Sequence, residues 1–243
     1  MGRSADRAKK KVYSERAVVN DFEAQLEYEQ NKPKFGPLQP RNPKQASLIQ
    51  TLGDKRMNFV TGPAGCGKTF VITSWAAEKL ESKEADRIVI VRPMVGCDED
   101  IGFLPGSLEE KYSPWLGPFL DVLEGKLGKK RVESYMKYGI ISAVPLMMMR
   151  GSTFRKSIVI LDEAQNTTIK QMKMFLTRIG EGARVVVDGD LEQSDLPGNT
   201  NGLKDVLELL KGRTTVGFTN FTESEITRDP LVRDIVMAYR NRN

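Results

Sequence analysis

One segment limits the folds open to this chain more than any other, and it consists of Gly62, Pro63, Ala64, Gly65, Cys66, Gly67, Lys68 and Thr69. It follows an apolar run at 57–61 and precedes a helical pattern, which predicts a strand, a tight turn and a helix. Gly62 and Gly67 allow the backbone to curl, so that successive N–H groups point inward at the positive end of the helix. We therefore expect an anion to bind here, although a plain strand-to-helix turn could also contain three glycines.

The segment fits the pattern G-x-x-x-x-G-K-[ST], which adds a cation and a metal ligand to the turn. Lys68 carries a positive charge to the β- and γ-phosphates of a nucleotide, and the Thr69 hydroxyl can bind a magnesium ion held between them. Since the flanking strand and helix also match, we predict a nucleotide-binding segment that extends from Gly62 to Phe70. The expected ligands are ATP and Mg²⁺.

Two carboxylates follow a second buried strand, predicted at 157–161. Asp162 can hold the magnesium ion through water, and Glu163 is then placed to polarise an attacking water. Two solvated acids at the end of a strand would be the alternative interpretation. The phosphate-binding segment favours the catalytic one.

Two glutamines extend the predicted site. The strand at 183–187 ends in a Gly-Asp-x-x-Gln turn, where the Gln193 amide could sense the γ-phosphate, unless the turn is an ordinary polar strand end. Gln45 lies in an N-x-x-Q segment shortly before the phosphate-binding turn, and its amide could pair with adenine. Such a segment is also a common helix start.

Composition bounds the class of protein. The 243 residues, 40% of them apolar, allow a sizeable core, and we expect a polar arm at 1–37 followed by one α/β domain at 38–243 with a parallel sheet flanked by helices. The sequence has neither a long apolar stretch nor the apolar middle of a signal peptide, so we expect a cytoplasmic protein without a membrane segment. With two cysteines and no histidine, a zinc site and a histidine-activated nucleophile are excluded.

A mild excess of positive charge suits a polyanionic partner. The net charge is +5 and the pI is near 9.1. A basic cluster is predicted around Gly128, formed by Lys126, Lys129, Lys130, Arg131 and Lys137. Trp115 and Phe119 could stack on bases, but their spacing of four favours packing against the core.

Several segments together resemble the PhoH family of P-loop ATPases, which is similar in its motor core to superfamily 1 helicases. The resemblance spans about 38–239, and its matching stretches are GPAGCGKT, the segment from Arg92 through GFLPGSLEEKY, RGSTF, IVILDEAQNTTIKQMKMFLTRIG, VDGDLEQSDLP and TRDPLVRDIV. DEAQNTT followed by QMKMFLTR is far more specific than GPAGCGKT alone. It implies a RecA-like fold, magnesium-dependent ATP hydrolysis, a link to RNA or single-stranded nucleic acid, and a hexameric assembly. The residues 94–97 are less typical of the family.

Assembly also has an argument of its own. Superfamily 1 helicases bind ATP between two motor domains, and this chain has room for one, so a neighbouring subunit would complete the site. Arg228, just before a proline-initiated helix, and Arg178 are the candidates to contact the γ-phosphate, in cis or across an interface; Arg228 could also be a surface residue.

The leading hypothesis is an ATPase that moves along or remodels nucleic acid. A nucleotide-gated scaffold with slow hydrolysis and a small-molecule phosphotransferase are the alternatives. GTP specificity is disfavoured because the sequence lacks an Asn-Lys-x-Asp element.

Overall fold

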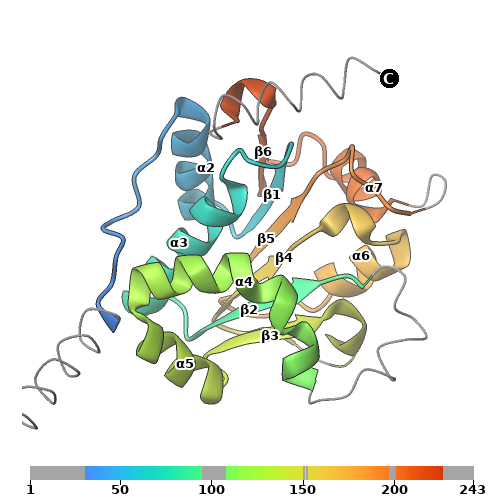
Figure 1. Cartoon of the computed structure of the whole chain (residues 1–243). Helices are drawn as coiled ribbons and strands as arrows, with labels where there is room; N and C mark the ends of the chain where they lie inside the picture. Colours follow the sequence, from blue (N-terminus) through green and yellow to red (C-terminus); the bar gives the residue numbers. More distant parts are fainter. Residues whose placement is uncertain (1–30, 95–107, 150, 152, 197–200, 227–243) are drawn as a thin grey trace, which may run out of the picture.

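A six-stranded parallel sheet forms the centre of the computed structural model, which describes residues 31–94, 108–149, 151, 153–196 and 201–226 (Figure 1). The strand order is β3-β2-β4-β5-β1-β6. The strands are β1 Met57–Thr61, β2 Arg87–Arg92, β3 Ile141–Pro145, β4 Ser157–Leu161, β5 Arg184–Gly189 and β6 Val216–Asn220. The helices are α2 Pro43–Asp54, α3 Lys68–Glu81, α4 Leu108–Leu127, α5 Lys129–Lys137, α6 Ile169–Leu176 and α7 Gly202–Leu209, with short 3₁₀ turns at Leu146–Met149, Ala164–Asn166 and Glu223–Glu225.

Helices cover both faces of this sheet, as parallel strands require (Figure 1). One apolar cluster joins the sheet to α2, α3, α4 and α5, and a second joins the opposite face to α6 and α7. The central strand β4 is buried along its whole length, which explains its continuous apolar sequence. The predicted α/β fold with a parallel sheet between helices is confirmed.

Side-chain alternation determines which face each strand residue serves. Val60, Ile160 and Val186 pack in the cluster beneath α3, whereas their neighbours pack against α6 and α7. Asp162 and Asp188 follow Ile160 and Val186 by two positions, so alternation directs both toward the α3 face. Polar groups at the ends of these strands thus lie on the side of the helix that starts at Lys68.

The strand order brings three chain segments to one edge. Strand β5 lies between β1 and β4, with Asp188 level with Val60 and Val187 level with Leu161. Since all strands are parallel, their carboxyl ends meet at the same edge, where ligands bind in open α/β sheets.

The segment before α2 packs on the core. The amides of Lys34 and Phe35 both donate to the Gly125 carbonyl, at 2.7 and 2.8 Å. Lys126 is buried, donates to the Gly36 carbonyl at 2.7 Å and pairs with Glu78. The predicted basic cluster is therefore wrong for Lys126, because a tertiary contact uses its charge.

Trp115 and Phe119 of α4 pack with the core. Phe119 is buried and Trp115 packs against the same cluster, as the helical spacing predicted. Within the described ranges, the structure has no helix that is both long and apolar enough to cross a membrane.

Candidate nucleotide-binding site

The turn between β1 and α3 depends on its glycines. Gly62 has φ +136°, and a Cβ there would lie 2.5 Å from the Phe221 carbonyl oxygen, so the residue must be glycine for two reasons. Gly67 adopts a left-handed conformation at the N-cap of α3 and provides no side-chain cap. The first N–H groups of a 14-residue helix therefore remain available to an anion.

Lys68 folds back over this turn. Its Nζ donates to the carbonyl oxygens of Gly62 and Pro63, at 2.8 and 3.1 Å, and lies 4.0 Å from Oδ1 of Asp188. The ammonium group is thus satisfied without a ligand, and a bound phosphate would have to replace these contacts.

Asp162 is buried at the end of β4. Burial raises the pKa of its carboxyl to about 6, against the opposing effect of the Arg92 guanidinium. The Arg92 Nε atom lies 3.7 Å from Oδ2 of Asp162. The Arg92 guanidinium thus offsets part of the cost of burying this carboxylate.

Glu163 adopts a strained left-handed backbone, with φ 52°. Its two carboxylate oxygens have different partners: Arg92 Nη2 donates to Oε1 at 3.1 Å, and Gln165 Nε2 donates to Oε2 at 2.5 Å. Gln165 in turn accepts a hydrogen bond from the Asp190 amide at 2.9 Å. These contacts fix the direction of the Glu163 carboxylate and connect β4 to the end of β5.

The residues around Lys68 enclose a cavity of about 430 Å³, which we call the phosphate pocket. It is lined by Ala64, Gly65, Gly67, Lys68, Thr69, Phe70, Pro118, Asp162, Glu163, Asp188, Gly189, Asp190 and Gln193. The lysine, the threonine hydroxyl, the two consecutive acids and the distant glutamine of the predicted site therefore share one pocket. Their catalytic and binding roles remain predictions.

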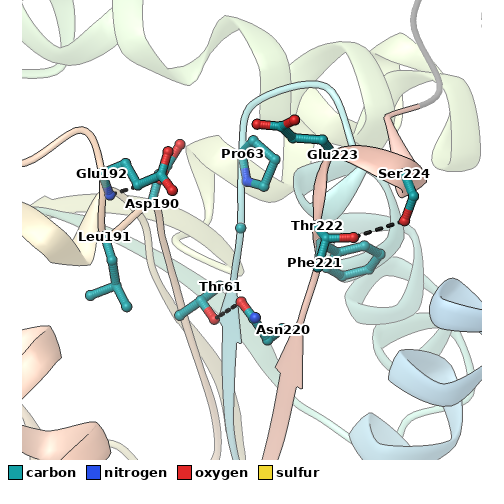
Figure 2. A pocket seen from close by; sticks show the side chains of 11 residues that line it. Thr61, Pro63, Asp190, Leu191, Glu192, Asn220, Phe221, Thr222, Glu223 and Ser224 are labelled. Atoms are coloured by element: carbon teal, nitrogen blue, oxygen red, sulfur yellow. Dashed lines mark hydrogen bonds between the residues drawn. The ribbon is translucent and has the colours of Figure 1, made fainter. Parts of the chain in front are cut away.

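Two residues of the turn face the other way. Gly62 and Pro63 line a neighbouring cavity of about 570 Å³ (Figure 2), the acidic cleft. Its other lining residues are Thr61, Asp190, Leu191, Glu192, Asn220, Phe221, Thr222, Glu223 and Ser224. The turn therefore separates two cavities at the same edge of the sheet.

Gln45 contacts the backbone of the turn between β1 and α3 outside the phosphate pocket. It is buried, its Oε1 accepts from the Arg41 amide at 2.9 Å, and its Nε2 donates to the Cys66 carbonyl at 3.0 Å. Asn42 caps α2 by accepting from the Gln45 amide, so the segment is indeed a helix start. Neither Gln45 nor Cys66 lines the phosphate pocket. The adenine contact stays a prediction that requires the Gln45 side chain to change partners.

The two candidate arginines differ. The Arg178 carbonyl accepts from the Phe154 amide at 2.9 Å, just before β4 begins, so Arg178 lies at the amino edge of the sheet. A role for Arg178 within its own subunit's site is therefore wrong, since the five-residue strand β4 separates it from Asp162. Arg228 lies outside the described residues.

Three residues that we did not predict as site residues contact the predicted ones: Arg92, Gln165 and Asp188. Arg92 ends β2 and Asp188 lies near the end of β5, so polar residues at strand ends were the available signal. Gln165 had no such signal, because its role depends on a 3₁₀ turn that brings it back to Asp190.

The oxygen atoms of the pocket suit magnesium. The Thr69 hydroxyl and the Asp162 carboxylate are hard ligands in one cavity, and Oδ1 of Asp188 is buried there with no hydrogen-bond partner among the described residues. No group of three or more acidic or cysteine side chains forms a metal cage in the described parts of the chain. A Mg²⁺ ion that keeps several waters and binds substrate phosphates fits this set.

A parallel sheet with a G-x-x-x-x-G-K-T turn between strand and helix, and acids two strands away, defines a P-loop NTPase. The family model described as PhoH-like protein matches residues 37–240. The chain belongs to the PhoH-like family.

Curated relatives agree with this assignment. Protein PhoH of Escherichia coli K12 is 43% identical over 210 residues, which cover 84% of this chain and 58% of that protein. A PhoH-like protein of Bacillus subtilis is 40% identical over 224 residues, covering 91% and 70%. The chain thus spans little more than half the length of the Escherichia coli relative.

Solved structures with similar folds include two helicases. They are the UvsW helicase from bacteriophage T4, with a TM-score of 0.44, 12% identity and coverage of 84% and 67%, and the Hef helicase domain of Pyrococcus furiosus, with a TM-score of 0.43, 11% identity and coverage of 72% and 37%.

Proposed function

We propose that this chain is a magnesium-dependent ATPase that couples hydrolysis to movement along, or remodelling of, RNA or single-stranded nucleic acid. The observation that carries the proposal is the phosphate pocket, where Lys68, Thr69, Asp162 and Glu163 line one cavity. An N–H cradle and a lysine bind phosphates, and oxygen ligands hold the ion that neutralises their charge.

Each side chain then has a distinct task. Lys68 exchanges the carbonyl oxygens of its own turn for the β- and γ-phosphates. Thr69 and Asp162 would hold Mg²⁺, which supplies charge stabilisation at the phosphates when bound. Glu163 orients and polarises the attacking water, and Gln193, on the same pocket wall, contacts the γ-phosphate.

The polynucleotide and the assembly are supported by sequence. The net charge of +5 suits a polyanion, and the family resemblance points to RNA. The family resemblance also supports a homo-oligomer, which we propose to be a hexameric ring in the cytoplasm. Arg228, or Arg178 acting only from a neighbouring subunit, would complete the site.

A polynucleotide-stimulated ATPase assay tests the proposal. Phosphate release by wild type and Glu163→Gln is measured with and without single-stranded RNA or DNA, at low and high salt. We expect the wild-type rate to rise with polynucleotide and the stimulation to fall steeply with salt, because binding releases counterions. Absence of any stimulation at low salt would reject the nucleic-acid part, and equal rates in both proteins would remove Glu163 as the catalytic residue.

One observation favours a second candidate, a nucleotide-gated scaffold with slow hydrolysis. Arg92 and Gln165 both donate hydrogen bonds to the Glu163 carboxylate in this structure. These bonds restrain the group that would activate water. Light scattering with and without ATP, beside the turnover assay, separates the two. A scaffold would assemble on ATP with negligible turnover under every condition.

A further inference from the structure

Asp188 is one of four carboxylates that line the phosphate pocket, beside Asp162, Glu163 and Asp190. It lies on β5 beside Val60, lines the pocket and is only 4% exposed. Its Oδ1 atom has no hydrogen-bond partner in the described part of the chain. A buried carboxylate oxygen without a hydrogen bond is unfavourable, and burial raises the pKa of Asp188 to about 7 although Lys68 and a backbone hydrogen bond at Gly189 oppose the rise. Such a group needs an explanation beyond packing.

The cation that faces Asp188 is Lys68. Oδ1 of Asp188 and Nζ of Lys68 are 4.0 Å apart, and both side chains are almost fully buried. Attraction between such charges is much stronger in a buried site than in water. The other cation near the acids is Arg92, which contacts Asp162 and Glu163. Of the charge pairs that the structure describes in this pocket, Lys68 and Asp188 form the one next to the phosphate-binding turn.

We propose that Asp188 is a positioning residue, whose carboxylate draws the Lys68 ammonium back against the turn and opposes the entry of phosphate. This proposal rests on the proposed function, since it assigns Lys68 to nucleotide phosphates. The ligand class it concerns is the nucleoside triphosphate, with or without its divalent ion.

The consequence is a charge-dependent cost of binding. A metal-free triphosphate must separate Lys68 from Asp188 and then lie in a pocket lined by four acids, Asp162, Glu163, Asp188 and Asp190. A magnesium ion offsets part of this repulsion. Asp188 would therefore weaken the binding of metal-free ATP more than that of the magnesium complex, and that of ATP more than that of ADP.

Asp188→Asn tests this proposal because it removes the charge and keeps the shape. Dissociation constants for ATP and ADP are measured by fluorescence titration, in EDTA and in Mg²⁺, for the full chain. We expect metal-free ATP to bind about tenfold more tightly to the variant, with smaller gains for ADP and for the magnesium complex. A merely structural residue would not produce this ordering by ligand charge.

The matched control is Asp195→Asn, which removes the same charge from the segment after β5 but outside the pocket. Asp195 is exposed there and bonds to Asn166. The control should leave all four constants near wild type. Asp188→Thr provides a second neutral variant in case the asparagine disturbs folding, and it should reproduce the same ordering.

The outcomes are separable. Unchanged or weaker ATP binding by a folded neutral variant, with normal wild-type binding, overturns the role of Asp188 and leaves the proposed function standing. A gain that is equal for every ligand also overturns it, because it would not depend on phosphate charge. If wild type itself binds no ATP, both the proposed function and this role of Asp188 are rejected.

Discussion

Two cavities lie side by side at the carboxyl edge of the sheet, and only one is suited to phosphate. The acidic cleft is the larger, at about 570 Å³ against about 430 Å³ for the phosphate pocket. Asp190, Glu192 and Glu223 line the cleft, and its described lining contains no lysine or arginine (Figure 2). Size therefore does not determine the function of a cavity here. Acids line both cavities, and the phosphate pocket differs in having Lys68 and the first residues of α3 in its lining.

The backbone explains the difference between the two. Pro63 has no N–H to offer and lies on the cleft side, whereas Gly65 and Gly67 line the phosphate pocket beside the helix start. In the cleft, Thr61 donates to Asn220 at 2.9 Å and ties β1 to β6 (Figure 2). One turn thus presents backbone N–H groups to one cavity and a proline without an N–H group to the other.

The largest effect expected from this comparison belongs to Lys68→Ala. Losing the cation of the phosphate pocket should weaken ATP binding about 100-fold or more, as removal of one member of a buried charge pair does. Glu223→Gln alters the acidic cleft alone and should leave the constant nearly unchanged. Isothermal titration of both variants checks this, and equal losses would show that the two cavities act as one site.

Glu163→Gln comes next and affects turnover rather than binding. Removing the proposed base should lower the ATPase rate by ~10²–10⁴-fold, while ATP still binds. Glu192→Gln is the matched change on the cleft side and should hydrolyse ATP at the wild-type rate. Phosphate release and nucleotide titration are measured together. A slow Glu192→Gln variant would contradict the assignment of chemistry to one pocket.

Much of the phosphate pocket could be predicted because most of its residues are adjacent to one another in the sequence. The turn and the Asp162-Glu163 pair each lie within one short segment, and the carboxyl ends of parallel strands must meet at one edge. Partners across the fold could not be predicted in this way. The burial of Lys126 against Glu78 and the inward bonds of Gln45 depend on helices that pack only in three dimensions.

The arginines show the same limit from another direction. The local sequence around Arg178 does not indicate that the chain returns along α6 to the amino edge of the sheet before β5 begins. Arg92 lies at the end of its strand, but its contact with both Asp162 and Glu163 requires β2 and β4 to be neighbours. Strand order, which periodicity does not encode, decides both cases.

Gly62→Ala tests how rigidly the turn separates the cavities. The new Cβ would meet the Phe221 carbonyl oxygen at 2.5 Å, in addition to the strain of φ +136°. We expect a loss of roughly 2–3 kcal/mol in the free energy of unfolding. Gly212→Ala has φ +77° and open space around the new atom, so it isolates the backbone strain. Urea unfolding compares them, and equal losses would mean that contact with Phe221 is unimportant.

The smallest effect is the pH dependence of stability, which should differ between the two sides of the turn. The pKa of Asp188 rises from 3.8 to about 7 on folding, chiefly through burial, and that of Asp162 rises from 3.8 to about 6. The folded protein therefore holds protons that the unfolded chain has lost, and the contribution of these groups to stability falls as pH rises from about 4 through 7.

Asp188→Asn should make the free energy of unfolding fall less steeply with pH, because one proton-binding group is lost. The slope should change by at most about 1.4 kcal/mol per pH unit. Urea unfolding of the nucleotide-free protein at several pH values between 4 and 8 measures the slope. Glu192→Gln removes an exposed carboxylate of the acidic cleft and should keep the wild-type slope. A slope that is unchanged in Asp188→Asn and altered in Glu192→Gln would reverse the comparison and place the buried negative charge on the cleft side.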